Sequence, residues 1–249
     1  MIASSPSLLT KYRVVIITYD GLVGQHFGRT RQFKLYYVAD GAIFASQILD
    51  TNGKGHGALA GLLQLANADA GTAQDVLVVV DMQVDFVDGA LGTAEAQAIV
   101  PRVCEVIGDW DGTVIATLDT HAPDYLQTQE GHNLPVVHCV RETPGWALNA
   151  QVAEALDARA EPYYVYEKPT FGSVALAGDL VAANAVRPIR SITLIGLCTD
   201  ICVVSNALLI KAALPEVPVR VLRDACAGVT PAAHDAALAT MASCQVAIV

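Results

Sequence analysis

The sequence predicts an α/β protein in which a doubly wound parallel sheet, over residues 71–249, follows a small α/β domain over residues 1–70. The first observation behind this prediction is an alternation after residue 74. Short apolar runs of strand length are followed by segments with helical spacing, which is typical of parallel α/β sheets. The second is the composition, which is 53% hydrophobic and only 16% charged. Parallel strands that are covered on both faces are apolar in this way.

The N-terminal domain contains three strand-like runs, at residues 13–19, at 33–38 and, more weakly, at 42–49. A turn rich in Gly and His then leads into a short apolar helix over residues 58–66. A core of this size is marginal by itself, so we expect this domain to pack against the larger one or against another copy of the chain. The small and polar stretch LANADAGTAQ, at residues 65–74, predicts a linker.

The larger domain is predicted to alternate strands and helices to the end of the chain. Strands are expected at residues 75–80, 113–118, 163–166, 191–195, 217–222 and 245–249. Helices are expected at residues 94–107, 146–158, 174–183, 200–213 and 232–242. Because crossovers between parallel strands are right-handed, these helices should cover both faces of the sheet.

Polar side chains follow the predicted strands at the points where the strands end. They are Asp81, Asp119, His121, Lys168, Cys198, Asp200, Cys202 and Asp224. The carboxyl ends of parallel strands share one edge of the sheet, and ligands bind at that edge. The sequence therefore predicts a crevice that gathers carboxylates, a lysine, a histidine and thiols.

This set of side chains has a definite chemistry. A free thiol, with a pKa of about 8.5, is only slightly ionised at neutral pH. We expect the Lys168 ammonium and the N-terminus of the fourth-strand helix to favour the thiolate. Asp81 would take the thiol proton and later deliver it to a leaving amine. Two backbone N–H groups at the start of that helix would bind the oxyanion, and the product would be an acyl-thioester that water hydrolyses.

Composition and charge exclude several other classes of function. The net charge is −10 and the sequence has no basic stripe, which argues against a nucleic-acid partner. No apolar run approaches the length that spans a bilayer. Nothing near Met1 resembles a secretory signal, so a cytoplasmic location is expected, with all six cysteines reduced.

Five sequence blocks resemble the cysteine hydrolases of the isochorismatase-like superfamily, and nicotinamidases especially. The blocks are DMQVDF at 81–86, DTH at 119–121, HCV at 138–140 with a following TPG, EKPTFGS at 167–173 and GLCTDICV at 196–203. The resemblance covers residues 74–249 and implies a three-layer α/β/α fold. It implies that Asp81, Lys168 and Cys202 are catalytic, with Cys202 rather than Cys198 as the nucleophile. The amides of Cys198 and Cys202 would bind the oxyanion, after a cis Leu197–Cys198 peptide bond.

The same resemblance implies a divalent metal ion, usually zinc, iron or manganese. Its ligands map to Asp119, His121 and His138, with Glu130 and His132 as candidates for a further ligand. Carboxylate oxygens and imidazole nitrogens suit such ions. In this family the metal orients a ring nitrogen of the substrate and does not generate the nucleophile.

The expected substrate is a small amide similar to nicotinamide, which would release ammonia. The family pattern places a stacking Trp three residues before the later metal His, and this sequence has Pro135 there. Phe86 and Trp146 are the remaining candidates for substrate contact. An N-carbamoyl or ureido substrate is the alternative, and a non-catalytic metal- or cofactor-binding protein is another. Family resemblance also implies a homo-oligomer.

Each candidate also has a structural interpretation. Cys202 on an apolar helix is compatible with a core thiol, Lys168 with a surface side chain, Asp81 with a cap and Asp119 with a turn. The presence of all five blocks together favours the catalytic interpretation. We interpret Asp85, Asp200 and Asp224 as structural, with Asp200 as a helix N-cap.

A domain over about residues 10–68 resembles the dinitrogenase iron–molybdenum cofactor biosynthesis domain. Residues 18–41 and 55–59 carry this resemblance. That resemblance implies an RNase H-like fold, truncated here because the Gly-rich second half is missing. His26 and His56 would be the ligands of a metal cluster. The alternative is a small domain that serves packing or oligomer contacts.

Overall fold

The computed structural model describes residues 13–18, 32–39, 42–50 and 73–249. Its contacts divide the chain into two units, Met1–Gly71 and Thr72–Val249. In the part of the chain that is described, no helix is both long and apolar enough to cross a membrane.

The first unit contains an antiparallel sheet with the strand order β1-β2-β3. Its strands are Arg13–Thr18, Gln32–Ala39 and Ala42–Asp50, so the three strands predicted from the sequence are present. The predicted helix at 58–66 and the candidate ligands His26 and His56 lie outside the described residues.

The second unit is built on a six-stranded sheet in which every neighbouring pair is parallel. The strand order is β6-β5-β4-β7-β8-β9. The strands are β4 Gln74–Val80, β5 Thr113–Asp119, β6 Tyr164–Lys168, β7 Ile189–Leu197, β8 Val219–Ala227 and β9 Ala247–Ile248. The six predicted strands and the doubly wound α/β class are confirmed.

All five predicted helices are present, with different ends. The main helices are α3 Ala94–Asp109, α5 Ala150–Asp157, α6 Val174–Val186, α7 Val204–Ala213 and α8 Pro231–Ser243. Short helices and turns are α2 Val84–Val87, η2 Tyr125–Gln127, α4 Gln129–Asn133, η3 Pro144–Trp146 and the π-helical turn η4 Thr199–Val203. Hydroxyl side chains of Thr93, Ser173 and Thr230 cap α3, α6 and α8.

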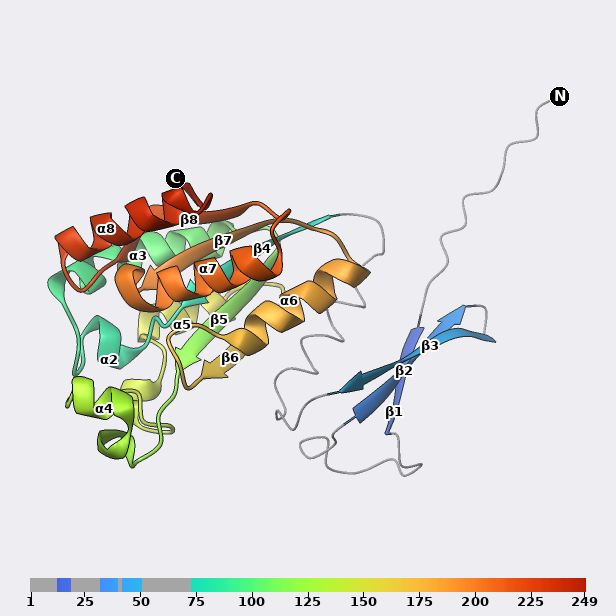
Figure 1. The fold of residues 1–249 in the computed structure, drawn as a ribbon, viewed down its shortest axis with the longest axis horizontal. Coiled ribbons are helices and arrows are strands. Elements are labelled where there is room, and N and C mark those ends of the chain that lie inside the picture. The colour runs from blue at the N-terminus through green and yellow to red at the C-terminus, as the bar shows by residue number, and fades with distance from the viewer. Residues whose placement is uncertain (1–12, 19–31, 40–41, 51–72) are drawn as a thin grey trace. The chain divides into compact units, whose positions relative to one another are not determined.

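Helices cover both faces of this sheet and enclose two separate cores (Figure 1). Side chains of β4 alternate between the two, as a two-residue period requires. Val76, Val78 and Val80 pack with residues of α6, α7 and α8. Leu77 and Val79 pack with residues of α3 and α5. This arrangement explains why β4 is a continuous apolar run, because both of its faces are buried.

The chain changes direction across the sheet between β4 and β7. From β4 it runs outward to β5 and β6, and after β6 it returns to β7 on the other side of β4. Gly196 makes the closest approach at this boundary. Its φ is 112°, and a Cβ there would lie 2.2 Å from the Val80 carbonyl oxygen, so only glycine fits. Ligand sites in open α/β sheets lie at such a switch point.

The predicted position of Asp224 is wrong. We expected β8 to end before Asp224, which would place its side chain in the crevice. Instead, the strand continues to Ala227 after an irregularity in its pairing with β7 between Leu194 and Gly196. Asp224 thus lies inside the strand, 62% exposed, and pairs with Arg102 at 2.9 Å.

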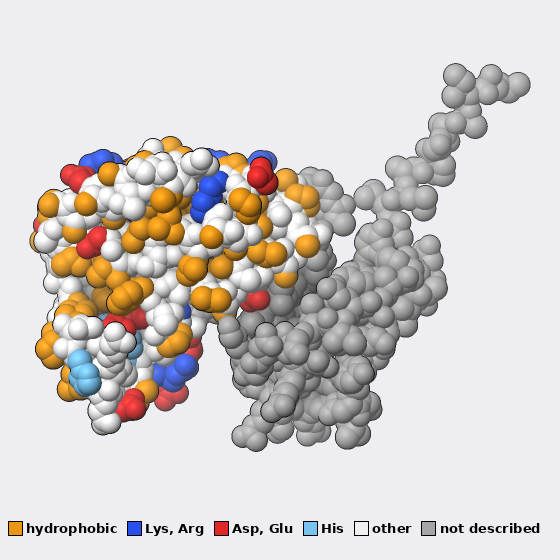
Figure 2. Space-filling model, in the orientation of Figure 1, with side chains coloured by type: hydrophobic (Ala, Val, Ile, Leu, Met, Phe, Trp, Pro, Cys, Tyr) orange, Lys and Arg blue, Asp and Glu red, His pale blue; other side chains and the backbone are white. Residues whose placement is uncertain are grey.

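Hydrophobic side chains are scattered over the face that carries α6 and α7 (Figure 2). On α6, Val174 is 67% exposed and Val181 is 41% exposed. The helix is apolar on most of its circumference, unlike a typical solvated helix with one apolar stripe.

Candidate active site

Four strand ends bring the central residues together. Asp81 directly follows β4, Asp119 ends β5 and Lys168 ends β6. Cys202 lies in η4, which follows β7. All four side chains are buried, so the predicted gathering of these residues at one edge of the sheet is confirmed.

Lys168 is the centre of this group. Its Nζ atom lies 2.6 Å from Oδ2 of Asp81, 3.3 Å from Oδ1 of Asp119 and 3.5 Å from Sγ of Cys202. Burial disfavours the ammonium, but Asp81, Cys202 and Asp119 together raise the pKa of Lys168 above its ordinary value. The lysine therefore stays charged inside the protein, and that charge faces the thiol.

Asp81 is held in a constrained position. Its φ is 48°, in the left-handed region that few residues other than glycine adopt. The Thr117 hydroxyl donates a hydrogen bond to Oδ1 of Asp81 at 2.7 Å. Burial raises the pKa of Asp81, and the neighbouring Lys168 charge opposes that rise.

Cys202 lies in the wide turn that begins at Cys198. The Cys198 carbonyl accepts hydrogen bonds from the amides of Ile201 at 3.1 Å and Val203 at 3.0 Å. The Asn206 side chain donates to the Cys202 carbonyl at 2.8 Å. The Leu197–Cys198 peptide bond is cis, as the family resemblance implies. The roles of the Cys198 and Cys202 amides as oxyanion donors stay predictions.

The state of the Cys202 thiol differs from the prediction. We expected Lys168 and the helix N-terminus to lower its pKa. Lys168 does lower the pKa, as expected, but burial and then the Asp81 charge outweigh it, so the pKa of Cys202 lies well above its ordinary value. The resting thiol is therefore protonated, and Asp81 is one of the ionisable groups that act on it. The carboxylate is thus in place to receive the thiol proton.

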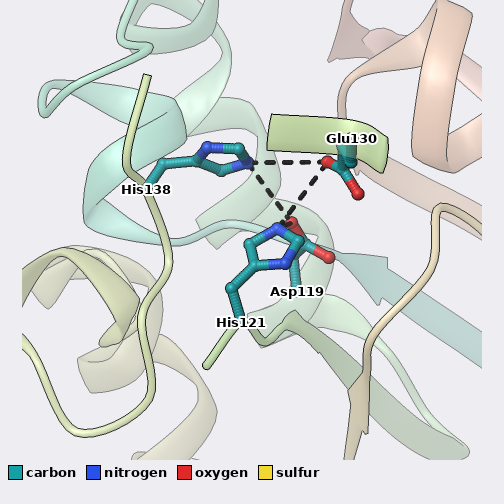
Figure 3. A group of neighbouring side chains, drawn as sticks. All are labelled: Asp119, His121, Glu130 and His138. Carbon is teal, nitrogen blue, oxygen red and sulfur yellow. Dashed lines mark ion pairs between the residues drawn. The ribbon is translucent and has the colours of Figure 1, made fainter. Parts of the chain in front are cut away.

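A second cluster adjoins this group. Asp119, His121, Glu130 and His138 each direct one ligand atom inward, and these atoms lie within 4.8 Å of one another (Figure 3). Glu130 comes from α4, whereas His121 and His138 come from the segments after β5 and after α4. His132, the other candidate, is exposed and is not in the cluster.

The donor atoms of this cluster fit a divalent cation. Among the described residues, Nε2 of His121 is buried without a hydrogen-bond partner, although it lies 3.0 Å from Oδ2 of Asp119. A shared cation would satisfy both atoms. Nδ1 of His138 lies 2.8 Å from the Val136 carbonyl oxygen, which directs Nε2 toward the cluster. Two imidazoles and two carboxylates suit zinc, iron or manganese.

The charges of the cluster depend on one another. Burial opposes ionisation of Asp119, but contacts with His121 and His138 and the Lys168 charge outweigh it and lower the pKa of Asp119. Burial likewise opposes the charged form of His138, while the contact with Asp119 raises its pKa overall. Burial raises the pKa of Glu130. Asp119 thus faces Lys168 with one oxygen and the histidines with the other.

Two supporting residues were not predicted from the sequence. Gln83 is fully buried and makes hydrogen bonds with both the amide of Asp119, at 2.7 Å, and its carbonyl, at 2.9 Å. The Tyr125 ring centroid lies 4.6 Å from that of His121 and 4.9 Å from that of His138. The block DMQVDF contains Gln83, but no local pattern in the sequence distinguishes Tyr125.

The structural aspartates are only partly as predicted. Asp85 does fix loops through backbone amides, since it accepts from Ala90 at 3.2 Å and from Cys139 at 2.7 Å. Asp200 is not an N-cap; its Oδ1 accepts instead from the distant Val229 amide at 3.0 Å. All six cysteines are free thiols.

The isochorismatase domain family matches residues 75–249 of this chain. The chain belongs to the isochorismatase-like hydrolase family. The matched range contains both clusters and all of the six-stranded sheet except Gln74, the first residue of β4. It does not extend to the first 74 residues, so the predicted dinitrogenase cofactor-biosynthesis domain is not supported. A search of curated proteins found no match.

Solved structures also resemble this hydrolase-family chain. A nicotinamidase/pyrazinamidase from Bacillus subtilis is 25% identical with a TM-score of 0.61, and the match covers 70% of this chain and 98% of that one. A pyrazinamidase from Pyrococcus horikoshii in complex with zinc is 28% identical with a TM-score of 0.58, over 71% and 98% of the two chains. An N-carbamoylsarcosine amidase from Thermoplasma acidophilum is 26% identical with a TM-score of 0.54, over 70% and 95%.

The aromatic candidates of this isochorismatase-like hydrolase lie beside the clusters. Phe86 is 8% exposed, and its ring centroid is 5.5 Å from that of His138. Trp146 was predicted to begin a helix, but it lies in η3, and the observed helix α5 begins only at Ala150. Its Nε1 donates to the Thr120 hydroxyl at 2.9 Å, which fixes the indole. Pro135 is exposed. Substrate contacts of Phe86 and Trp146 stay predictions.

Proposed function

We propose that this protein is a cysteine amidohydrolase that releases ammonia from a small amide similar to nicotinamide. The observation that carries the proposal is the buried Lys168 ammonium, 2.6 Å from Asp81 and 3.5 Å from the Cys202 sulfur. A nucleophile, a proton acceptor and a fixed positive charge are thus in contact. Family membership supports hydrolysis, and the amidase relatives support a carbon–nitrogen bond as its target.

Acylation would proceed as follows. Asp81 takes the Cys202 thiol proton, and the thiolate attacks the carbonyl carbon of the amide while Lys168 stabilises the developing negative charge. The carbonyl oxygen becomes an oxyanion at the amides of Cys198 and Cys202. Asp81 then donates its proton to the leaving nitrogen, the carbon–nitrogen bond breaks and ammonia leaves.

Deacylation would use the same groups in reverse. Asp81 accepts a proton from a water molecule that attacks the thioester carbonyl. The carbon–sulfur bond breaks, and the proton returns to the Cys202 sulfur, so that a carboxylic acid is released and the resting thiol is restored. Each proton that Asp81 accepts is given up within the cycle.

Asp119, His121, Glu130 and His138 would hold a divalent metal ion, which we propose to be zinc, iron or manganese. Such an ion supplies a Lewis-acid coordination position that fixes the orientation of a bound substrate. The zinc complex of the Pyrococcus horikoshii relative supports zinc in particular. Asp119 also contacts Lys168, so it would position the metal cluster and the lysine relative to each other.

An N-carbamoyl or ureido compound is the second candidate substrate. Pro135 favours it, because that position lacks the aromatic face that would stack on a pyridine ring. The N-carbamoylsarcosine amidase relative also supports it. A purely metal-binding protein without catalysis is the remaining alternative, and the contact of Cys202 with an intact acid and lysine argues against it.

We further propose that the protein acts as a cytoplasmic homo-oligomer without nucleic-acid or membrane partners. The exposed apolar side chains of α6 support self-association. Light scattering after size exclusion would measure the mass, and a strictly monomeric protein at micromolar concentration would contradict this part.

Ammonia release from nicotinamide and from an N-carbamoyl amino acid tests the function. The native chain should release ammonia from one of them, Cys202→Ala should not, and treatment with a chelator should reduce the rate. Cys226→Ala is the matched control, since that thiol is also buried but has no contact with Lys168 in the structure described. Equal rates for Cys202→Ala and the native protein would contradict the proposal.

A further inference from the structure

The turn that carries Cys202 lacks a cap of its own. Its N-cap residue is Cys198, and no side chain caps the turn there. π-Helical turns are rare in proteins overall, but many of those that occur lie at functional sites. The Asn206 side chain holds the end of the turn through the Cys202 carbonyl, so the start of the turn needs contacts of its own.

Two side chains at the start of this turn contact the segment that runs from the end of β8 into α8. The Thr199 hydroxyl lies 2.8 Å from Nδ1 of His234, and Oδ1 of Asp200 accepts from the amide of Val229 at 3.0 Å. Val229 belongs to the connection between β8 and α8, and His234 lies in the first turns of α8. Thr199 is fully buried, so its hydroxyl has no access to solvent.

The backbone is close-packed at the same place. A Cβ at Gly228 would lie 2.8 Å from Oδ1 of Asp200 and 2.8 Å from the amide nitrogen of His234. The connection can therefore approach the nucleophile turn this closely only with glycine at position 228. Burial, together with the charge of Arg223, lowers the pKa of His234. In a neutral ring protonated on Nε2, Nδ1 accepts a hydrogen bond from the Thr199 hydroxyl.

We propose that Thr199 and His234 are positioning residues that hold the π-helical turn so that the Cys202 sulfur stays within reach of Lys168 and Asp81. Neither residue contacts the reacting atoms; they act through the turn. The proposal rests on the proposed function, since it assigns these residues to the same nucleophile. Their sequence separation of 35 residues is bridged by the parallel pairing of β7 with β8, which places α8 next to η4.

Iodoacetamide alkylation of Cys202 in the full-length protein tests this without knowledge of the substrate. Modification is followed by peptide mass spectrometry, with exposed Cys244 as the internal reference. Thr199→Val and His234→Ala remove the contact. Thr199→Ser keeps the hydroxyl, and His234→Asn keeps an acceptor near the Nδ1 position. Asp235→Ala is the matched control, because it removes an exposed ion pair from the neighbouring position of the same helix.

A single buried hydrogen bond corresponds to about a tenfold change in a rate. Thr199→Val and His234→Ala should therefore slow the alkylation of Cys202 about tenfold relative to Cys244. Thr199→Ser, His234→Asn and Asp235→Ala should keep the native rate. Where an amide substrate is available, kcat should fall with KM unchanged. Thermal melting would verify that each variant is folded.

Two results would overturn the proposal. One is an alkylation rate of Cys202 that is native or faster in both Thr199→Val and His234→Ala. The other is an equal fall in the alkylation rate of Thr199→Ser and His234→Asn, which would indicate general loosening of α8. The failure of the proposed function itself looks different: Cys202→Ala would then release ammonia at the native rate, whatever the alkylation rates of the Thr199 and His234 variants.

Discussion

At the scale of single residues, Lys168 links the two clusters of the site. Its ammonium lies 2.6 Å from Asp81, beside the proposed nucleophile, and 3.3 Å from Asp119, in the proposed metal cluster. It is only 1% exposed. A buried charge is tolerated when it is paired, and removal of one partner leaves the other uncompensated. Stability and the proposed chemistry would therefore depend on the same side chain.

Lys168→Met should destabilise the protein by about 3–5 kcal/mol, because two buried carboxylates lose their counter-charge. The double variant Asp81→Asn/Lys168→Met should lose much less free energy of unfolding than the two single variants lose together. Urea denaturation of the metal-free protein measures this coupling. Additive losses would mean that the 2.6 Å pair contributes no interaction energy.

Tyr125 packs against the proposed metal cluster from outside it. Its ring packs on His121 and His138, and its hydroxyl donates to the Leu134 carbonyl at 2.9 Å. That bond ties the segment before His138 to η2. The side chain is completely buried.

Tyr125→Phe should weaken zinc binding about tenfold, since disturbance of groups that orient metal ligands costs at least that much. Calorimetric titration of zinc into chelator-treated protein measures the affinity. Tyr166→Phe is the matched control, because it removes a similar hydroxyl contact, to Asp179 at 2.9 Å, on the side of α6. Equal affinity for Tyr125→Phe and native protein would refute the positioning role.

At the scale of elements, the short helix α4 decides which candidate joins the cluster. Glu130 and His132 both lie in α4, two residues apart. Residues at that spacing point to different sides of a helix, and only Glu130 faces inward (Figure 3). Thr128 caps the helix by accepting from the Gly131 amide at 3.0 Å, which fixes this orientation.

Glu130→Gln should lower zinc affinity by more than about tenfold, because it removes a charged donor from the cluster. His132→Gln, in the same helix, should leave the affinity unchanged. Both variants should melt at the native temperature without metal. A loss of zinc affinity in His132→Gln as large as that in Glu130→Gln would contradict the assignment of Glu130 as the ligand.

The element order was predictable because its signals are local. The apolar runs at β4 and β7 and the helical spacing between the strands depend only on neighbouring residues. Element ends were less predictable, since they depend on tertiary pairing. Asp224 was misplaced because the extension of β8 follows from an irregular register with β7. Trp146 was misplaced because a separate turn at Pro144–Trp146 precedes α5.

The site was predictable where side chains follow strand ends. Asp81, Asp119, Lys168 and Cys202 fall in that class, and the parallel topology alone brings them together. The supports were not predictable. Tyr125 and His234 act on partners that only the folded chain brings near, and nothing in their local sequence marks them. The pKa of Cys202 was predicted in the wrong direction, because the sequence does not show how deeply the thiol is buried.

At the scale of the whole molecule, the second unit contains everything that the proposed chemistry uses. Residues 72–249 include the complete six-stranded sheet, both apolar cores and both polar clusters. The family match also begins only at residue 75.

A protein of residues 72–249 should therefore unfold in a single cooperative transition and bind zinc with the affinity of the full chain. Its Cys202 should also be alkylated at the full-length rate. Circular dichroism, calorimetry and mass spectrometry provide the three measurements. A fragment that aggregates, or that folds without binding zinc, would show that the first 71 residues are needed for the site.

The most direct test of the central claim is detection of the acyl-enzyme. The native protein is mixed with an amide substrate, quenched in acid within its first turnovers and digested for mass spectrometry. The account predicts that the peptide with Cys202 gains the mass of the acyl group, and that Lys168→Met forms far less of it. Substrate turnover with no adduct on Cys202, or with an adduct on another residue, would contradict the account.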